Sequence, residues 1–299
     1  MTVRREGLVR RMWLLLTLMA AVGLTGCASM GPAPRPVATL EKIKATKTIA
    51  LGFRDSSIPF SYVGPTKEPM GYSVDLCLRV VEDLRRDLKL PDLQARWLPV
   101  TVETRVRALV DGTIDLECGS TTNTLSRQEQ VDFSLTTFIT GASLLTLAGA
   151  NVGDQLGAIR IAVIPGTTTE QMVKEAMTSM GATAEAARLI AVKDHADGLA
   201  AVTARRADVY ASDRAILMGL VMSASEPRQF ALLDRYLSYE PYALMLRRDD
   251  PSFRLAVNRT LARLYRSRQV LDIYRRWFGQ WGDPNALTLG LYAVEGLPE

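Results

Sequence analysis

Apolar residues along the chain fall into two recurring patterns, short unbroken runs and positions spaced three or four apart. The runs are rich in Val, Ile and Leu and end in Gly or polar residues, which is typical of buried strands. The predicted strands are residues 48–53, 95–100, 114–117, 159–164, 189–192, 209–212 and 241–246. Helical spacing predicts helices at residues 74–88, 102–110, 170–180, 198–206 and 251–278. Strands that alternate with helices favour an α/β fold with mostly parallel sheets.

The first 26 residues have the pattern of an export signal. Arginines form a cationic start, and an almost wholly apolar run follows at residues 13–24. That run is too short to span a bilayer as a helix of the mature chain. Residues 24–27, Leu-Thr-Gly-Cys, resemble a bacterial lipobox, in which the cysteine becomes the lipidated first residue. We therefore expect a signal peptide at 1–26, lipidation of Cys27 and a Pro-rich tether over 27–39; the alternative is an ordinary signal peptide with a chance cysteine.

Length, charge and the scarcity of histidine narrow the possible classes of function. Residues 40–278 span about 240 residues without low-complexity sequence, enough for two domains or for one domain of two lobes. The whole chain has a net charge of +4, but four arginines and one glutamate before Cys27 supply three of these charges. The mature chain is thus near neutral, which is weak support for nucleic-acid binding. One histidine and three cysteines without ligand spacing argue against a metal enzyme, and we expect no metal and no cofactor.

Cys77 and Cys118 are the two cysteines of the expected folded part. In an oxidising compartment such a pair often bonds, but two buried thiols fit the sequence equally well. The sequence leaves both possibilities open, because it does not give the distance between the two residues.

Polar residues follow most of the predicted strands. Arg54 follows the first strand, residues 119–122 the third and residues 166–168 the fourth. His195 and Asp213 come after the fifth and sixth. In open α/β sheets, ligands bind outside the carboxyl ends of the strands. We therefore expect these side chains to gather at a binding site.

These residue types suit a small zwitterion with an additional negative charge. Arginine binds a carboxylate through two parallel, charge-assisted hydrogen bonds. Arg127 lies in a Ser-x-x-Glu pattern that predicts a helix start, where backbone N–H groups also favour an anion. An ammonium group requires an acceptor, and Asp213 is the best-placed carboxylate. The same aspartate is also a possible helix cap.

Four stretches of the sequence resemble the bacterial extracellular solute-binding proteins of family 3. They are residues 53–62 (FRDSSIPFSY), 117–123 (ECGSTTN), 165–170 (PGTTTE) and 193–195 (KDH). The likeness extends over residues 40–278, and the first two stretches are specific to the branch that binds acidic amino acids. It implies a two-lobed periplasmic-binding-protein fold of type II, in which a two-strand hinge joins the sheets. Lobe 1 would comprise residues 40–146 and 239–280, lobe 2 residues 147–238, and residues 281–299 a tail.

The resemblance also implies roles for eight residues. The α-carboxylate would be held by Ser120, Thr122, Arg127 and Thr168. Asp213 would take the α-ammonium group, and the side-chain carboxylate would contact Arg54, Arg105 and His195. In one departure, Val102 stands where a relative has a serine that contacts ligand, which leaves the preference between glutamate and aspartate open.

The resemblance implies the substrate-binding component of an ABC importer. We expect a monomer that captures glutamate or aspartate and delivers it to a membrane permease. We expect it outside the cytoplasm, in the periplasm, tethered to the membrane by lipid. One alternative is an enzyme on the same fold, similar to cyclohexadienyl dehydratases, with Glu117 or Asp213 as acid–base group. The other is a ligand-sensing subunit that acts through a partner.

Overall fold

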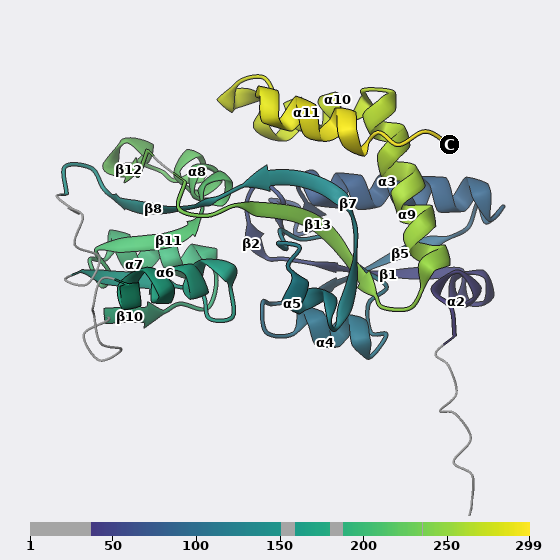
Figure 1. Ribbon diagram of the computed structural model, residues 1–299, viewed down its shortest axis with the longest axis horizontal. Helices are drawn as coiled ribbons and strands as arrows, with labels where there is room; N and C mark the ends of the chain where they lie inside the picture. Colours follow the sequence, from purple (N-terminus) through teal and green to yellow (C-terminus); the bar gives the residue numbers. More distant parts are fainter. Residues whose placement is uncertain (1–36, 151–158, 180–187, 235) are drawn as a thin grey trace, which may run out of the picture. The chain divides into compact units, whose positions relative to one another are not determined.

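Two five-stranded sheets organise the chain, and each forms the centre of one lobe (Figure 1). The computed structural model describes residues 37–150, 159–179, 188–234 and 236–299. The sheet of lobe 1 has the strand order β5-β1-β6-β13-β7, and that of lobe 2 the order β10-β9-β11-β8-β12. The expected two-lobed α/β fold is therefore confirmed.

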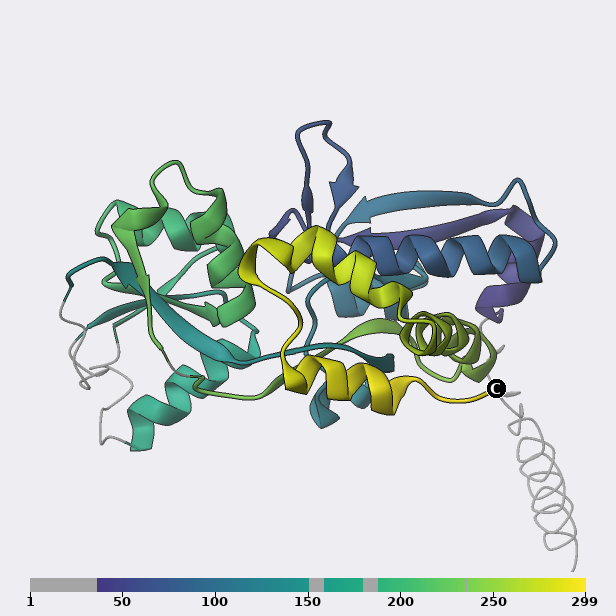
Figure 2. The same cartoon turned by 90° about the horizontal axis from the view of Figure 1, so that it is seen from above.

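Lobe 1 is built from both ends of the described chain. Its main sheet contains β1 (Thr48–Phe53), β5 (Gln94–Pro99), β6 (Leu116–Glu117), β7 (Val131–Thr140) and β13 (Glu240–Arg247). A small sheet adds β2 (Ser56–Ser57), β3 (Ser61–Val63) and β4 (Pro69–Met70). Its helices are α2 (Thr39–Thr46), α3 (Tyr72–Asp87), α4 (Arg105–Val110), α5 (Leu125–Gln128), α9 (Pro251–Arg266), α10 (Gln269–Phe278) and α11 (Ala286–Glu295). Helices α10 and α11, yellow-green to yellow in Figure 2, each contact α9.

Lobe 2 is formed by the middle of the chain. Its strands are β8 (Ala142–Leu147), β9 (Arg160–Val163), β10 (Arg188–Ala191), β11 (Val209–Asp213) and β12 (Phe230–Leu232). Its α-helices are α6 (Thr168–Ser179), α7 (His195–Thr203) and α8 (Arg214–Ser223). Helices α6, α7 and α8 each contact β11, so the central strand of this sheet is well covered.

The two sheets are mixed, whereas the sequence predicted mostly parallel ones. β1 is parallel to β5 and β6, and β9 is parallel to β10 and β11. The antiparallel pairings come from β13 in lobe 1 and β8 in lobe 2. The chain passes from β7 into β8 through Gly141 alone and returns through the segment that precedes β13. A Cβ on Gly141 would lie 2.2 Å from the carbonyl oxygen of Ser238, so the two crossing segments approach too closely for a larger residue.

Several elements differ from the sequence-based expectation. The crossing lies at Gly141, whereas the expected boundary at 146/147 falls at the end of β8. The helix predicted over 251–278 is two helices, because Arg268 adopts a left-handed backbone with φ of 60°. The expected tail contains α11, and its Tyr292 hydroxyl bonds to that of Tyr72 at 2.8 Å. The expected signal peptide, Cys27 and nearly all of the tether lie outside the described residues.

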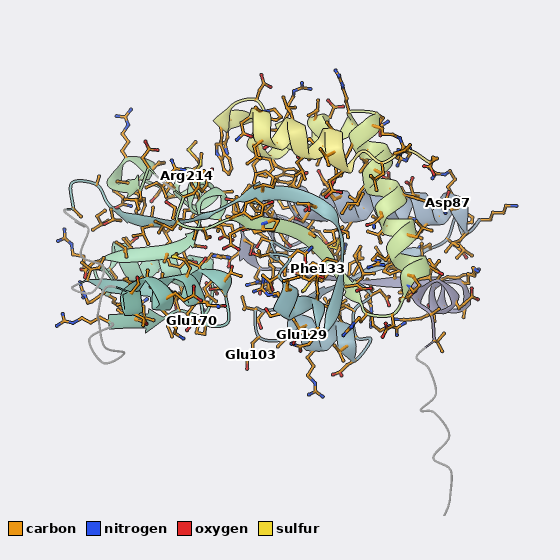
Figure 3. All side chains as sticks on the ribbon, in the orientation of Figure 1. Asp87, Glu103, Glu129, Phe133, Glu170 and Arg214 are labelled. Atoms are coloured by element: carbon orange, nitrogen blue, oxygen red, sulfur yellow. A yellow bond between two sulfur atoms is a disulfide. The ribbon has the colours of Figure 1, made fainter. Side chains whose placement is uncertain are left out.

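Apolar side chains fill the space on both faces of the sheets (Figure 3). Phe133, labelled there, packs in a cluster with Val100 and with Leu109 of α4. A second feature of lobe 1 is the ring of Phe60, which lies 5.0 Å from that of Tyr242 in the strand that returns to this lobe. None of the helices described is long and apolar enough to cross a bilayer.

A disulfide bond joins Cys77 in α3 to Cys118, directly after β6. The structure thus decides between the two states that the sequence left open. The bond closes a loop across 41 positions of the sequence, and its two Cα atoms lie 6.2 Å apart. It ties the end of β6, which leads into the polar residues 119–122, to helix α3.

Removing this disulfide is expected to destabilise the fold. Replacing both cysteines, in Cys77→Ser with Cys118→Ser, should lower the free energy of unfolding by about 2–4 kcal/mol. The unfolded chain gains freedom, and two buried positions receive hydroxyl groups. Calorimetric melting of the mature chain should show a fall of roughly 5–15 °C. An unchanged melting temperature would mean that the bond contributes nothing to stability.

Candidate ligand-binding site

One pocket receives side chains from both lobes. It lies at the strand ends and helix starts of the two sheets. All eight residues singled out from the sequence line it: Arg54, Arg105, Ser120, Thr122, Arg127, Thr168, His195 and Asp213. Val102, the departure noted in the sequence, also lines it. The pocket further contains Thr167, one of the residues 166–168 expected there from the sequence. Its other lining residues were not indicated by the sequence, namely Ile164, Thr169, Tyr210, Ala211, Ser212 and Ile216.

Arg54 and Arg105 place two guanidinium groups at the pocket, although each residue is only 4% exposed. Among the described residues, neither group has a carboxylate within 4.0 Å. Burial lowers the pKa of Arg105 to about 9 against the opposing effect of Glu117, so the group remains cationic at neutral pH. Burial also lowers the pKa of Arg54. Because buried charges are normally paired, two buried arginines without an ion-pair partner indicate a site for an anion.

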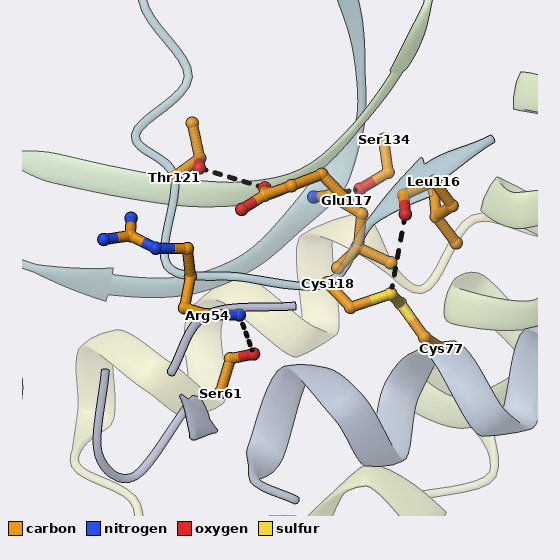
Figure 4. The surroundings of a disulfide bond; sticks show 9 residues. Arg54, Ser61, Cys77, Leu116, Glu117, Cys118, Thr121 and Ser134 are labelled. Carbon is orange, nitrogen blue, oxygen red and sulfur yellow. Dashed lines mark hydrogen bonds between the residues drawn. A yellow bond between two sulfur atoms is a disulfide. The ribbon is translucent and has the colours of Figure 1, made fainter. Parts of the chain in front are cut away.

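Arg105 is positioned through Thr121 and Glu117. Its Nη1 donates to Thr121 Oγ1 at 2.6 Å. Thr121 Oγ1 in turn donates to Glu117 Oε2 at 3.0 Å, as Figure 4 shows. The Nε atom of Arg105 and the Oε1 atom of Glu117 are buried without a hydrogen-bond partner in the described part of the chain. The Glu117 carboxylate rests against the backbone of Gly119, where a Cβ would lie 2.0 Å from Oε1. Successive contacts from Arg105 to Thr121, from Thr121 to Glu117 and from Glu117 to Gly119 therefore fix the position of the Arg105 guanidinium.

His195 begins α7, directly after its N-cap Asp194. Its Nδ1 atom lies 2.6 Å from the hydroxyl of Tyr210. Burial first, and then the charges of Arg54 and Arg105, lower the pKa of His195 to about 3. The imidazole is therefore neutral at neutral pH. It offers one hydrogen-bond donor or acceptor to the pocket and adds no charge.

Asp213, at the end of β11, is the one acidic residue among those that line the described pocket. Its carboxylate accepts hydrogen bonds from the Tyr242 hydroxyl and, at 3.4 Å, from Thr169 Oγ1. Burial first, and the charge of Glu240 second, raise the pKa of Asp213 to about 7. The carboxylate is thus poorly stabilised as an anion until a cation comes close. Its side chain does not cap α8, which was the alternative role.

Thr122 and Thr168 donate their hydroxyl hydrogens to the same atom. Both bond to Glu240 Oε2, at 2.6 Å and 2.8 Å. Arg127 Nη1 donates to the carbonyl oxygen of Thr122 at 2.8 Å. Burial lowers the pKa of the Arg127 guanidinium, against the charge of Glu240. Arg127, Thr122 and Thr168 therefore form one network that is centred on a carboxylate behind the pocket.

The helix start that the sequence predicted at Arg127 occurs, with a local difference, and a second helix, α6, also begins at this site. Arg127 lies in the first turn of α5, as expected, but the cap is Thr124, which accepts from Arg127 N–H at 3.2 Å; the sequence had indicated Ser126. At α6, Thr167 Oγ1 accepts from Glu170 N–H at 3.1 Å, and Glu170 accepts from Gly166 N–H at 2.8 Å.

The pocket has no metal-binding character in the part of the chain that the structure describes. There, no three residues among His, Cys, Asp and Glu gather closely enough to hold an ion. The lining residues offer cationic donors, hydroxyl groups, one neutral imidazole and one carboxylate acceptor.

Solved structures with the same fold include several solute-binding proteins. An ABC uptake transporter substrate binding protein from Streptococcus pneumoniae, with bound histidine, gives a TM-score of 0.72 at 20% identity. The alignment covers 83% of this chain and 99% of that one. A mutant of ArgBP from T. maritima gives a TM-score of 0.71 at 20% identity, with 80% and 99% covered. At this identity the likeness establishes the fold alone.

Sequence comparison finds nearer relatives. The L-glutamate/L-aspartate-binding protein of Pseudomonas aeruginosa is 39% identical over 264 residues, which is 87% of this chain and 86% of the relative. The glutamate/aspartate import solute-binding protein of Escherichia coli is 35% identical over 269 residues, with 89% and 86% covered. The family model of bacterial extracellular solute-binding proteins, family 3, matches residues 49–280. The chain therefore belongs to the bacterial extracellular solute-binding proteins of family 3.

Proposed function

We propose that this chain is the substrate-binding component of an ABC importer and that it captures glutamate or aspartate. The observation that carries the proposal is the pair of buried guanidinium groups, Arg54 and Arg105, without carboxylate partners in the described residues. A side-chain carboxylate of a ligand would supply the missing partner. The relatives named as glutamate- and aspartate-binding proteins support the same choice.

The pocket residues divide into subsites by their chemistry. Arg54, Arg105 and the neutral His195 would bind the side-chain carboxylate. Arg127 would hold the α-carboxylate together with Ser120, which is 9% exposed and follows β6. An amino-acid dicarboxylate has two anionic groups and one cationic group, so three arginines and Asp213 would complement all of its charges.

Asp213 would bind the α-ammonium group. It is buried, and the donors that reach it are hydroxyl groups, so an ammonium would be its strongest hydrogen-bond donor. Thr122 and Thr168 fit the same subsite better than the α-carboxylate that the sequence suggested for them. Each hydroxyl has one hydrogen, and both hydrogens go to Glu240. Only their lone pairs remain for a ligand, and these accept from an ammonium group.

Val102 contributes methyl groups to the pocket at a position where a hydroxyl would supply a hydrogen bond. A Cβ on Gly166 of lobe 2 would lie 3.4 Å from Val102 Cγ1, so this side chain also lies against the opposite lobe. The preference between glutamate and aspartate would depend on how far the ligand side chain reaches past this surface.

The family places the protein outside the cytoplasm. We extend the proposal to a lipid anchor at Cys27, a monomeric chain in the periplasm and delivery to the permease subunits of the importer. A bound ligand would favour the closed state of the lobes only through contacts that it makes in that state and not in the open one.

A thermal-shift screen against the twenty amino acids tests the proposed ligand class. Glutamate and aspartate should raise the melting temperature most, because a ligand that binds only the folded state stabilises it by mass action. Glutamine and asparagine should have much smaller effects, since they lack the second anionic group. A largest shift with an uncharged or cationic amino acid would contradict the proposal.

Incubation with prephenate, followed by a search for product, tests the alternative of a dehydratase.

Ligand affinity is expected to fall as the pH drops below about 7, where Asp213 takes up a proton. A protonated carboxyl no longer accepts as an anion, so the affinity should fall by up to about tenfold per pH unit. The ligand's own side-chain carboxyl, with a pKa near 4.3, stays ionised over most of this range. Calorimetric titrations from about pH 5 to pH 8 would measure this, and Asp213→Asn should show weak binding without the slope. Equal affinities across this range would place the ammonium elsewhere.

A further inference from the structure

Glu240 is a buried carboxylate outside the set of residues that line the pocket. It begins β13, the strand by which the chain returns from lobe 2 to lobe 1, and it is 2% exposed. Three hydroxyl groups donate to it. Ser238 bonds to Oε1 at 2.7 Å, while Thr122 and Thr168 bond to Oε2 at 2.6 Å and 2.8 Å.

These donors come from different parts of the molecule. Thr122 lies in lobe 1, where it pairs with Tyr242 as an isolated bridge. Thr168 is the first residue of α6 in lobe 2. Ser238 belongs to the crossing segment itself, close to Gly141 in the other crossing. One oxygen atom of Glu240 therefore joins a hydroxyl of lobe 1 to a hydroxyl of lobe 2.

We propose that Glu240 is a clasp that holds the two lobes closed from within the hinge, and that it is a positioning residue for the ligand site. Opening the lobes would separate Thr168 from Thr122, so Oε2 would lose one of its two donors. The closed state thus gains a charge-assisted hydrogen bond that the ligand itself does not make. The affinity part of this inference rests on the proposed function.

Besides the hydrogen bond from Tyr242 in lobe 1 to Asp213 in lobe 2, another bond between the lobes provides a comparison. The N–H of His195 in lobe 2 donates to Ser56 Oγ in lobe 1 at 3.3 Å. That bond is longer and its acceptor is neutral, whereas the acceptor in Glu240 is a carboxylate shared between the lobes. Hydrogen bonds to charged groups are the stronger class, so Glu240 should contribute more to the lifetime of the closed state.

The test is Glu240→Gln, which keeps the size of the side chain. A glutamine amide has one acceptor oxygen and one NH2 group, so it cannot accept from all three hydroxyls. Stopped-flow measurements with glutamate should show dissociation about tenfold to a hundredfold faster, with the association rate within about twofold of the wild type. Ser238→Ala is the matched control, because it removes the donor to the other oxygen within the crossing segment. Its dissociation rate should change by less than about threefold.

Other outcomes overturn the clasp. Equal effects of Glu240→Gln and Ser238→Ala would indicate general damage to the hinge, and an unchanged dissociation rate would show that Glu240 is only structural. If the wild type does not bind glutamate, the proposed function fails. The clasp is then tested on the ligand-free proteins, by comparing their radii of gyration in small-angle scattering. A larger radius of gyration in Glu240→Gln supports it, and an equal radius contradicts it. Should Glu240→Gln fail to fold, Thr168→Val removes the lobe 2 donor, and the radius of gyration of the ligand-free variant is compared with that of the wild type in the same way.

Discussion

Replacing Arg105 by alanine should weaken the binding of glutamate by about two to four orders of magnitude, while glutamine binding changes far less. Breaking a buried, hydrogen-bonded charge pair by removing one partner costs about 3–5 kcal/mol, because the other charge stays buried and unpaired. Only a ligand with an anionic side chain forms that pair. Arg54→Ala should act in the same direction. Calorimetric titration of each variant with both amino acids measures the difference.

Arg107→Ala is the matched control for this experiment. Arg107 lies on the same helix, α4, but its side chain is 83% exposed and pairs with Asp111 at 2.9 Å. Removing it changes the net charge and the helix surface without touching the pocket, so the affinity for glutamate should stay within about threefold. A loss in Arg105→Ala that is equal for glutamate and glutamine would refute the assignment of Arg105 to the side-chain carboxylate.

Gly219→Ala should prevent the lobes from closing fully and lower the ligand affinity by about tenfold to a hundredfold. Gly219 lies in α8 of lobe 2, and a Cβ there would meet the carbonyl oxygen of Ile58 in lobe 1 at 2.5 Å and its carbon at 2.8 Å. Both atoms belong to the backbone, so no side-chain rotation relieves the contact. The missing side chain of Gly219 thus permits the close approach of the lobes.

Gly290→Ala tests whether this effect arises from the contact or from the loss of a helical glycine. Gly290 lies in α11, and a Cβ there would meet no atom within 4 Å. Alanine should stabilise that helix by up to about 1 kcal/mol and leave the affinity unchanged. Titration calorimetry and small-angle scattering with ligand would compare the two variants. Wild-type affinity and wild-type dimensions in Gly219→Ala would show that the contact does not limit closure.

Much of the α/β framework was predictable because its buried parallel strands are short apolar runs. The prediction of residues 48–53 agrees with β1, and 209–212 lies within β11. The crossing strand β7 was missed. Its sequence, VDFSLTTFIT, mixes hydroxyl groups with apolar residues, and its buried and half-buried positions do not alternate regularly. The pattern therefore lacked the period that identifies a strand.

The candidate site was predictable where its residues lie at strand ends. Arg54 and His195 belong to this group, and sequence order alone indicated that they converge. Glu240 and Tyr242 were not found, because they lie in a strand whose antiparallel pairing was not anticipated. A single glutamate before Pro241 carries no motif that indicates three hydroxyl donors from distant parts of the chain. Such a network depends on tertiary contacts, which sequence spacing does not reveal.

The disulfide illustrates the same limit. Cys77 lies on a helix and Cys118 follows a strand, 41 positions apart in the sequence. Whether they bond depends on how α3 packs beside β6, which is a property of the folded chain. The sequence contains both cysteines and indicates export to an oxidising compartment. The distance between the two cysteines depends on the packing of the folded chain.

A crystal structure of the protein with bound glutamate tests the central claim most directly. The side-chain carboxylate should lie within about 2.7–3.2 Å of guanidinium nitrogens of Arg54 and Arg105, with the ammonium group at Asp213. Guanidinium groups turned out to bulk solvent, or an uncharged or cationic solute between the lobes, would contradict the claim.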